Sequence, residues 1–341
     1  MKFGIFDHMD RAKVPLGQQY EERLQLAQAY ERAGFHALHI AEHHGTPLGM
    51  SPSPSVFLSA VAQRTRRLRF GPLIYPLPMY HPLRLAEEIC MLDHLSGGRL
   101  ELGVGRGASQ FELQYYGIDV ATVQPQYFEA FAIVMQALTS RTLTYEGKFH
   151  SFRDVPMEFE PLQKPHPPLW YGPHNPETVV WPARNNVNIV SNLPSPGVRR
   201  ITDRYRREWA DAGHSGPLPF MAINRFLVLA DTDEQAMTIA RRAYDHWHTS
   251  FYRLWVVHKT PPNNVAYPRT FDEIEQMGYG IAGTPEKVRG MLLAQAEEAG
   301  VNYLVCRFAF GDLTLAESLR SLELFERGVM PAFSGMRAAA E

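Results

Sequence analysis

The polarity of the chain alternates between short apolar runs and longer amphipathic segments from one end to the other. In the first half, runs rich in β-branched and aromatic residues predict strands at 2–6, 36–41, 68–75 and 99–105. Apolar residues at helical spacing predict helices at 20–34, 53–65, 82–96 and 126–138. Strands that alternate with helices are expected to pair in parallel through right-handed crossovers.

The second half repeats this alternation less regularly. Strands are predicted at 168–172, 187–192, 219–230 and 302–308. Helices are predicted at 175–184, 196–212, 232–248, 286–299 and 314–327. The total is about eight strand–helix pairs, which favours an α/β fold closed as a (β/α)8 TIM barrel over an open sheet.

Two stretches interrupt the pattern, after the fourth and the seventh predicted strands. Residues 139–167 contain "TYEGKFHSF" (144–152), which resembles a hairpin with its turn at Glu146-Gly147. Residues 249–285 contain "KTPPNN" and few periodic positions. We expect a single domain over 1–341. Because long insertions in compact domains usually serve a function, we expect residues 249–285 to form a lid.

Composition and charge exclude several classes of protein. The 341 residues are 45% hydrophobic and 21% charged, as in an ordinary globular protein, and the two cysteines lie far apart in sequence, so no disulfide framework is expected. The net charge of −2 argues against a nucleic acid or an anionic membrane as a partner. The N-terminus turns polar after six residues, and no apolar run approaches the roughly 18 residues that span a bilayer. We expect a cytoplasmic protein.

The functional site of such a barrel lies where its strands end. The residues that follow the predicted strands are Asp7-His8, Glu42-His43-His44, 73–78, 105–109 and 172–175. Together they are polar, basic and rich in glycine. This composition suits a site for an anionic cofactor.

Two of these segments are candidates for binding a phosphate. "GVGRGA" (103–108) matches the dinucleotide fingerprint formally, but it follows a fourth strand and precedes a poor helix. It can instead be a tight loop without a ligand, or a loop that presents Arg106 and a bare backbone to a phosphate. In "YGPHNPETVV" (171–180), Asn175 can cap a helix with Thr178 in its first turn, either as a plain cap or as an anion site.

The stretch "ALHIAEHHG" (37–45) places three polar residues at the end of an apolar strand. Successive side chains of a strand point to opposite sides, so Glu42, His43 and His44 cannot converge on one metal unless the backbone turns sharply. We therefore expect no metal. The two histidines can be structural, or one of them can provide a group that titrates near pH 7 at the mouth of the site.

Five segments, in this order and spacing, resemble the luciferase-like monooxygenase superfamily, the flavin-dependent barrel enzymes that include bacterial luciferase. They are "MKFGIF", "AGFHALHIAEHHG", "LRFGPLIYPLPMYHPLRLAEE", "MLDHLSGGRLELGVGRG" and "YYGID". The resemblance covers essentially the whole chain and is densest over 1–117. It implies a homodimeric barrel that receives reduced FMN from a separate NAD(P)H:flavin reductase. With O2 and a C4a-peroxyflavin, such an enzyme oxygenates a small organic substrate.

The resemblance also implies roles for individual residues. His43 matches the histidine beside the reacting edge of the flavin, where it would perform general acid–base catalysis. Arg106, Asn175 and Thr178 match positions that contact the FMN phosphate. Luciferase has a reactive cysteine just before that arginine, and here Gly105 takes its place.

Further matches concern the flavin ring and its phosphate. Leu73-Ile74 matches a non-proline cis peptide under the flavin, and Glu87 matches a carboxylate near the isoalloxazine ring. A second phosphate-side arginine is replaced near residues 124–126, and a glutamate of the family is His174 here. We therefore expect Arg106 to carry more of the phosphate charge, together with His174.

The substrate pocket is expected beside these residues, with apolar walls and one titrating corner. We assign to it Asp7, His8, Tyr75 and Met79, with Tyr80 beside them. The alternatives to an FMN-dependent monooxygenase are a deazaflavin-dependent hydride-transfer oxidoreductase and a non-catalytic flavin-binding protein. The double histidine and the "LDHLSGGR" context favour FMN, while His43 and the expected lid argue against a protein that only binds flavin.

Overall fold

A parallel barrel forms the centre of the computed structural model, which describes residues 1–107, 109–261 and 267–334. Its strands are β1 (Lys2–Asp7), β2 (Ala37–Ile40), β3 (Arg69–Pro72), β4 (Tyr75–Pro76), β5 (Leu102–Gly105), β8 (Leu169–Tyr171), β9 (Asn188–Ser191), β10 (Met221–Leu229) and β12 (Tyr303–Arg307). They pair in the order β3-β2-β1-β12-β10-β9-β8-β5-β4, and a bridge between Phe70 and Leu100 joins β3 to the segment before β5. Because β3 pairs with β2 and β4 with β5, they share one position, and the barrel has eight positions. The predicted fold is confirmed.

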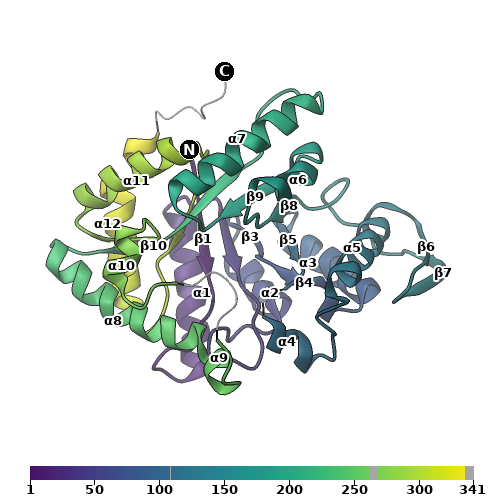
Figure 1. The fold of residues 1–341 in the computed structure, drawn as a ribbon, viewed down its shortest axis with the longest axis horizontal. Helices are drawn as coiled ribbons and strands as arrows, with labels where there is room; N and C mark the ends of the chain where they lie inside the picture. The colour runs from purple at the N-terminus through teal and green to yellow at the C-terminus, as the bar shows by residue number, and fades with distance from the viewer. Residues whose placement is uncertain (108, 262–266, 335–341) are drawn as a thin grey trace.

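The helices surround this barrel (Figure 1). They are α1 (Leu16–Arg32), α2 (Pro54–Arg64), α3 (Pro82–Ser96), α5 (Val123–Thr139), α6 (Val180–Arg184), α7 (Ser195–Asp211), α8 (Asp233–Phe251), α11 (Pro285–Ala299) and α12 (Leu315–Gly328). Their apolar faces pack on the outward side chains of the strands, such as Ile5 and Leu304, in the largest hydrophobic cluster. The inward side chains form a separate cluster around Phe6, Trp170 and Tyr303. This alternation decides which polar residues reach the interior of the barrel.

Helix ends differ from the sequence-based predictions by a few residues. α1 begins at Leu16 and α5 at Val123, earlier than predicted, because their first turns lack the apolar spacing that marks the rest of each helix. By contrast, α3 ends at Ser96 as predicted, and the following Gly97 adopts a left-handed conformation with φ of 65°. The short helices η1 (Leu77–Met79), η2 (Pro176–Val179) and η3 (Met330–Phe333) complete the connections.

The two predicted insertions have different outcomes. Residues 139–167 contain an antiparallel hairpin of β6 (Thr142–Glu146) and β7 (Ser151–Pro156), as expected, and it projects beyond α5 in Figure 1. Residues 249–285 are not one insertion, because β11 (Gly280–Gly283) pairs in parallel with Phe226 to Leu229 of β10. The sequence "GIAG" is too short and too poor in β-branched residues to signal a strand.

The rest of the expected lid holds two short helices, α9 (Arg253–Val257) and α10 (Phe271–Gln276). Residues 262–266, within and after "KTPPNN", lie outside the described residues. Another short helix, α4 (Gln110–Tyr115), follows the "GVGRGA" segment, where the sequence indicated only a poor helix. Figure 1 shows α4 and α9 at the lower edge of the molecule, opposite the N-terminus.

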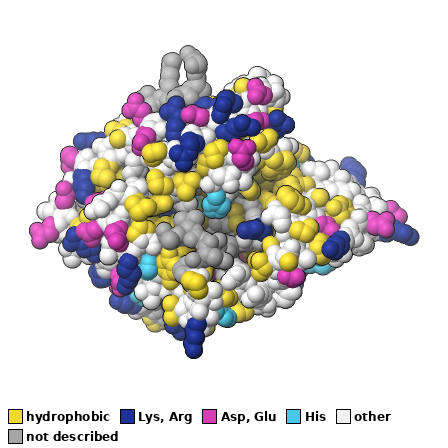
Figure 2. Space-filling view, in the orientation of Figure 1, with side chains coloured by type: hydrophobic (Ala, Val, Ile, Leu, Met, Phe, Trp, Pro, Cys, Tyr) yellow, Lys and Arg dark blue, Asp and Glu magenta, His cyan; other side chains and the backbone are white. Residues whose placement is uncertain are grey.

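The surface is mixed in charge. On the face shown in Figure 2, Lys and Arg side chains are interspersed with Asp and Glu around the periphery, and hydrophobic side chains are more frequent toward the middle. Charge of one sign therefore does not dominate this face. Among the helices of the described residues, none is long and apolar enough to cross a membrane.

Candidate active site

His43, the first residue assigned to catalysis, lies just beyond the end of β2 and is held by a carboxylate. Its Nδ1 is 3.1 Å from Oε1 of Glu112 in α4, and the other oxygen of Glu112 accepts the backbone N–H of His44 at 3.3 Å. A carboxylate at Nδ1 favours a proton on that nitrogen. The opposite nitrogen, Nε2, is thereby left to exchange protons, and the side chain of His43 is 17% exposed.

Glu112 was not found from the sequence, although a local signal was present. Ser109 and Glu112 have the S-x-x-E spacing of a capping box, and Ser109 Oγ accepts the N–H of Glu112 at 3.4 Å. In a complete capping box the glutamate would return to the serine backbone. Here it turns to His43 and His44 instead, so a helix-capping pattern also supplies a site residue.

Glu42 and His44 form a second network that braces the turn after β2. His44 Nε2 lies 2.8 Å from Glu42 Oε1, and its Nδ1 lies 2.8 Å from the hydroxyl of Tyr116. Tyr80 donates its hydroxyl proton to the other oxygen of Glu42 at 2.6 Å. Burial raises the pKa of Glu42. These residues therefore support the backbone around His43 rather than its ring.

His8, which follows β1, lies beside His43 as expected, with ring centres 5.6 Å apart. Trp247 of α8 donates its Nε1 proton to His8 Nδ1 at 3.3 Å. Burial, the charge of Arg307 and then His43 lower the pKa of His8 well below 6.5, so this ring is neutral at neutral pH. In the part of the chain that the structure describes, no three His, Cys, Asp or Glu residues are grouped to hold a metal ion.

The phosphate candidates follow the neighbouring strands β5 and β8. Arg106 and His174 are exposed, and within the described residues neither has an acidic partner. Desolvation by surrounding groups and then the charge of Arg106 lower the pKa of His174, so the two groups interact electrostatically. Two adjacent basic groups without a counter-charge fit a phosphate.

Asn175 caps the short helix η2 as predicted, but the cap uses the groups that were expected to bind an anion. Its Oδ1 accepts the N–H groups of Glu177 at 3.0 Å and Thr178 at 3.2 Å. The hydroxyl of Thr178 donates to the backbone oxygen of Asn175 at 2.8 Å. In this arrangement the side chains of Asn175 and Thr178 are engaged in the helix cap.

The peptide bond between Leu73 and Ile74 is cis, as the resemblance implied. It separates β3 from β4, next to the strand β5 that Arg106 follows. A Cβ atom at Gly105 would lie 2.9 Å from Ile74 Cδ1. A side chain at position 105 would therefore require the side chain of Ile74 to shift.

The expectation for Asp7 is wrong, because strand alternation turns its side chain outward. It is buried, and its Oδ2 lies 2.8 Å from Nε of Arg23 in α1. Glu87 lies on the outer helix α3, where its side chain is exposed. Neither carboxylate reaches the mouth of the barrel.

Tyr75 does not line the mouth either, and Met79 lies next to α4. Tyr75 is 1% exposed in the outer core, with its hydroxyl 2.7 Å from Oγ of Ser55 in α2. Met79 packs against Leu113 and Ile118. Of the four residues assigned to the substrate pocket, the structure brings only His8 beside His43.

α4 connects the site to α9 of the expected lid. His258, at the end of α9, stacks on Phe111 with ring centres 4.2 Å apart, and its Nε2 lies 2.6 Å from the hydroxyl of Tyr115. Phe111, Glu112, Tyr115 and Tyr116 all belong to α4 or directly follow it. The short helix α4 and the residue after it therefore contact His43 and His44 on one side. On the other side they contact His258, which belongs to the segment 252–261.

Comparison with known proteins identifies the family. The family model for luciferase-like monooxygenases matches residues 1–303. The chain is 47% identical over 323 residues to the uncharacterized protein y4wF of Sinorhizobium fredii, covering 94% of this chain and 93% of that protein. It is 26% identical over 353 residues to the oxygenase component of a flavin-dependent trigonelline monooxygenase of Acinetobacter baylyi, covering 98% and 96%.

A solved structure gives the same result. The monooxygenase RslO1 of Streptomyces bottropensis superimposes with a TM-score of 0.88 at 27% sequence identity, and the match covers 98% of this chain and all of that one. The sequence and the fold thus agree over nearly the whole length. The chain belongs to the luciferase-like monooxygenase family and is an oxidoreductase of the monooxygenase class.

Proposed function

We propose that this protein is the oxygenase component of a two-component, FMN-dependent monooxygenase. A separate NAD(P)H:flavin reductase would supply the reduced FMN, as the name of the trigonelline relative suggests. The reduced flavin supplies two electrons for the activation of O2. One oxygen atom then enters a small organic substrate, and the other leaves as water.

The observation that carries this proposal is the pair of His43 and Glu112 at the mouth of the barrel. Because Glu112 holds Nδ1, His43 can bind or release a proton at Nε2. A protein that only bound flavin would not require this arrangement. The same pair argues for catalysis over the non-catalytic alternative.

The remaining residues support a placement for FMN. We place its phosphate at Arg106 and His174, and its ring system beside the Leu73-Ile74 peptide and His43. Residues 252–261 and 267–279 would cover the bound molecules, since α9 already contacts α4 through His258. This assignment gives α4 two tasks, because it orients His43 and receives the lid.

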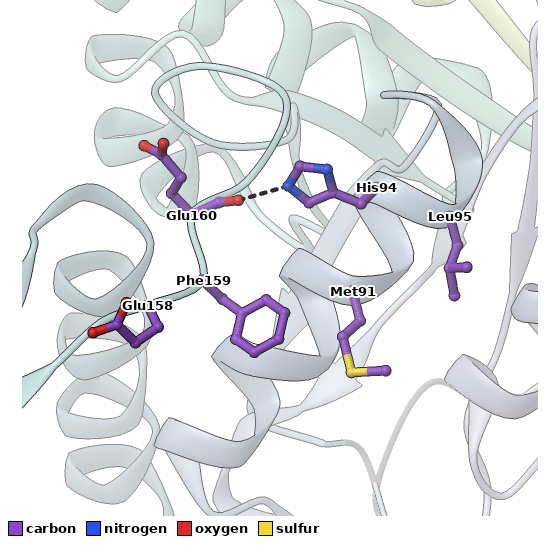
Figure 3. A pocket seen from close by; sticks show the side chains of 6 residues that line it. All are labelled: Met91, His94, Leu95, Glu158, Phe159 and Glu160. Atoms are coloured by element: carbon purple, nitrogen blue, oxygen red, sulfur yellow. Dashed lines mark hydrogen bonds between the residues drawn. The ribbon is translucent and has the colours of Figure 1, made fainter.

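We also propose a homodimer, in which α3 lies at the interface. Met91 and Leu95 of α3 are 51% and 53% exposed, and Phe159 nearby is 46% exposed. Figure 3 shows these side chains around an open hollow, where His94 Nε2 lies 3.0 Å from the backbone oxygen of Glu160. Such a patch of large apolar side chains favours association. A Leu95→Glu variant should sediment as a monomer if this surface is the interface.

Rapid mixing of the FMNH2-loaded protein with O2 tests the proposed activity. We expect a transient absorbance that differs from those of reduced and oxidised FMN, and slower flavin oxidation than in free solution. Oxidation as fast as that of free FMNH2, with one H2O2 released per flavin, would contradict the proposal. Binding of a deazaflavin coenzyme in preference to FMN would favour the hydride-transfer alternative.

A further inference from the structure

A buried arginine that the proposed reaction does not yet use lies at the end of β12. Tyr303 and Val305 of this strand face the interior of the barrel, whereas Leu304 and Cys306 pack in the outer core. By this alternation Arg307 also points inward, at the end of the strand that opens on the site. It is 4% exposed.

The guanidinium of Arg307 has only partial hydrogen bonding. Its Nε donates to Oδ1 of Asn224 at 3.1 Å, and its Cζ lies 4.8 Å and 4.4 Å from the ring centres of Phe6 and Phe226. Its Nη1 is buried without a hydrogen-bond partner among the described residues. Burial lowers the pKa of Arg307, and the nearby hydroxyl of Tyr267 partly offsets this effect.

No carboxylate of the described residues compensates this charge. Asp10 lies nearby, but burial raises its pKa to about 8, and its Oδ2 accepts the N–H of Gly311 at 2.6 Å. Asp7 is already bound to Arg23. A buried cation without a counter-charge is costly, unless a ligand supplies the negative charge.

Arg225, on β10, shows that this fold can provide a neutral acceptor for each nitrogen of a buried arginine. Its Nε donates to Gln295 Oε1 at 2.7 Å, its Nη1 to the backbone oxygen of Asn224 at 2.8 Å, and its Nη2 to that of Leu193 at 3.1 Å. Each of its three nitrogens has an acceptor. Arg307 differs because its Nη1 has no acceptor among the described residues.

We propose that Arg307 and Asn224 form a subsite that binds the carboxylate of an anionic organic substrate. This inference rests on the proposed function, because it names the substrate class of the same site. Phe6 and Phe226 flank the guanidinium, and Trp247 lies 4.8 Å from Phe226 between ring centres. These aromatic walls suit an unsaturated or hydrocarbon body attached to the carboxylate.

The order of the strands places this subsite away from the phosphate end of the flavin. β12 is four positions from β5, which precedes Arg106, in either direction around the barrel. β2, which leads to His43, is two positions from β12 and two positions from β5. The two anions would thus be held by different arginines on opposite sides, with the proton-exchanging histidine between them.

Calorimetric titration of the flavin-free protein with benzoate and octanoate tests the subsite, and benzamide serves as the neutral control. We expect at least one carboxylate to bind, with benzamide at least tenfold weaker than benzoate. Arg307→Met should weaken carboxylate binding more than tenfold. Arg106→Gln removes the other arginine. This variant should leave carboxylate binding unchanged and should weaken the binding of FMN.

Asn224→Asp is the second variant, because it introduces an internal carboxylate next to Arg307 with almost no change in shape. It should also weaken benzoate binding more than tenfold, and it decides the matter if Arg307→Met does not fold. Failure of both carboxylates to bind, or undiminished binding in the variants, would overturn the subsite. A loss of FMN affinity alone in the Arg307 variant would assign the guanidinium to the flavin and also overturn it. Since no flavin is present in the carboxylate titration, its outcome is independent of the oxygen-mixing experiment.

Discussion

The two ends of the barrel carry similar polar residues, but they use them differently. At the N-terminal end, Glu101 is 2% exposed and contacts Arg69 Nε at 2.6 Å, His36 Nε2 at 3.5 Å and Nε1 of Trp170. At the C-terminal end, His43 Nε2, Arg106 and Nη1 of Arg307 have no such partners within the described residues. At the first end the buried carboxylate is paired with basic and N–H groups, whereas the second end leaves donors and acceptors for a ligand.

This difference shows how one fold separates stability from function. The network at the N-terminal end stabilises the barrel because each charge has a partner there. The C-terminal end carries buried or partly buried polar groups that cost stability until a ligand binds. Substitutions at the C-terminal end should therefore reduce turnover more than stability, and substitutions at the N-terminal end should mainly reduce stability. The largest expected effect comes first.

Replacing His43 tests the open end most severely. His43→Ala removes the group that exchanges a proton at the mouth, and we expect substrate oxygenation to fall by roughly 10²–10⁴-fold. The free energy of unfolding should hardly change, because the ring is partly exposed. Product formation and urea unfolding measure the two quantities. Normal turnover by this variant would remove His43 from the mechanism.

Replacing Glu101 tests the closed end. Glu101→Gln leaves Arg69 and its neighbours without their counter-charge, and we expect a loss of about 3–5 kcal/mol in the free energy of unfolding. Glu160→Gln is the matched control, because its exposed partner Lys164 remains solvated and the midpoint should not move. Equal denaturant midpoints for the wild type and Glu101→Gln would contradict the comparison.

The effect of Glu101 should also depend on pH. Burial opposes ionisation, but the hydrogen bond from His36 and the charges of His39 and Arg69 outweigh it and lower the pKa of Glu101 to about 2. The contribution of this carboxylate is therefore complete above about pH 4.5 and is lost as the pH falls toward 2. The stability difference between the wild type and Glu101→Gln should shrink over this range.

His39 lies between the two ends, and it should also make the stability depend on pH. Here the cause is a buried group that stays neutral, not a carboxylate that stays ionised. His39 is fully buried against Trp170, both ring nitrogens lack partners among residues that the structure describes, and burial lowers its pKa to about 4. The unfolded chain takes up a proton below about pH 6.5 and the folded protein does not, so stability falls between pH 6.5 and 4, by about 3 kcal/mol in total. His39→Leu should lack this contribution, and the difference between the two proteins should be constant above pH 6.5. A difference that is constant from pH 4 to 8 would refute this prediction.

Glu112→Gln should have the smallest effect, since it alters the orientation and basicity of His43 without removing it. We expect a loss of about 10–100-fold in turnover, with a changed pH profile and little change in substrate KM. His258→Ala leaves Glu112 in place but removes the contact between α9 and α4, which makes it a useful companion variant. An unchanged pH profile in Glu112→Gln would indicate that the carboxylate only stabilises α4.

The sequence predicted the barrel because local patterns are enough to mark most strands and helices. It placed His8 and His43 at the mouth for the same reason, since both directly follow a strand. It misplaced Asp7, although this residue is adjacent to His8, because strand register decides which of two neighbours faces the interior. The side chains of Tyr75 and Glu87 also lie on the outer side of their elements, which the local sequence pattern does not reveal.

Other site residues depend on contacts that no local pattern encodes. Glu112 reaches His43 across 69 residues of sequence, and Asn224 meets Arg307 across 83. The unsatisfied Nη1 of Arg307 is a property of the packed interior, so a basic residue at the end of a strand does not reveal it. The cis peptide between Leu73 and Ile74 was expected only from the family resemblance.

A crystal structure of the protein with FMN would test the central claim most directly, namely that the open end of the barrel is a flavin site. The account predicts that the phosphate contacts Arg106 and His174, and that the ring system lies beside Leu73-Ile74 and His43. FMN bound away from these residues, or a ring system that does not approach His43, would contradict it.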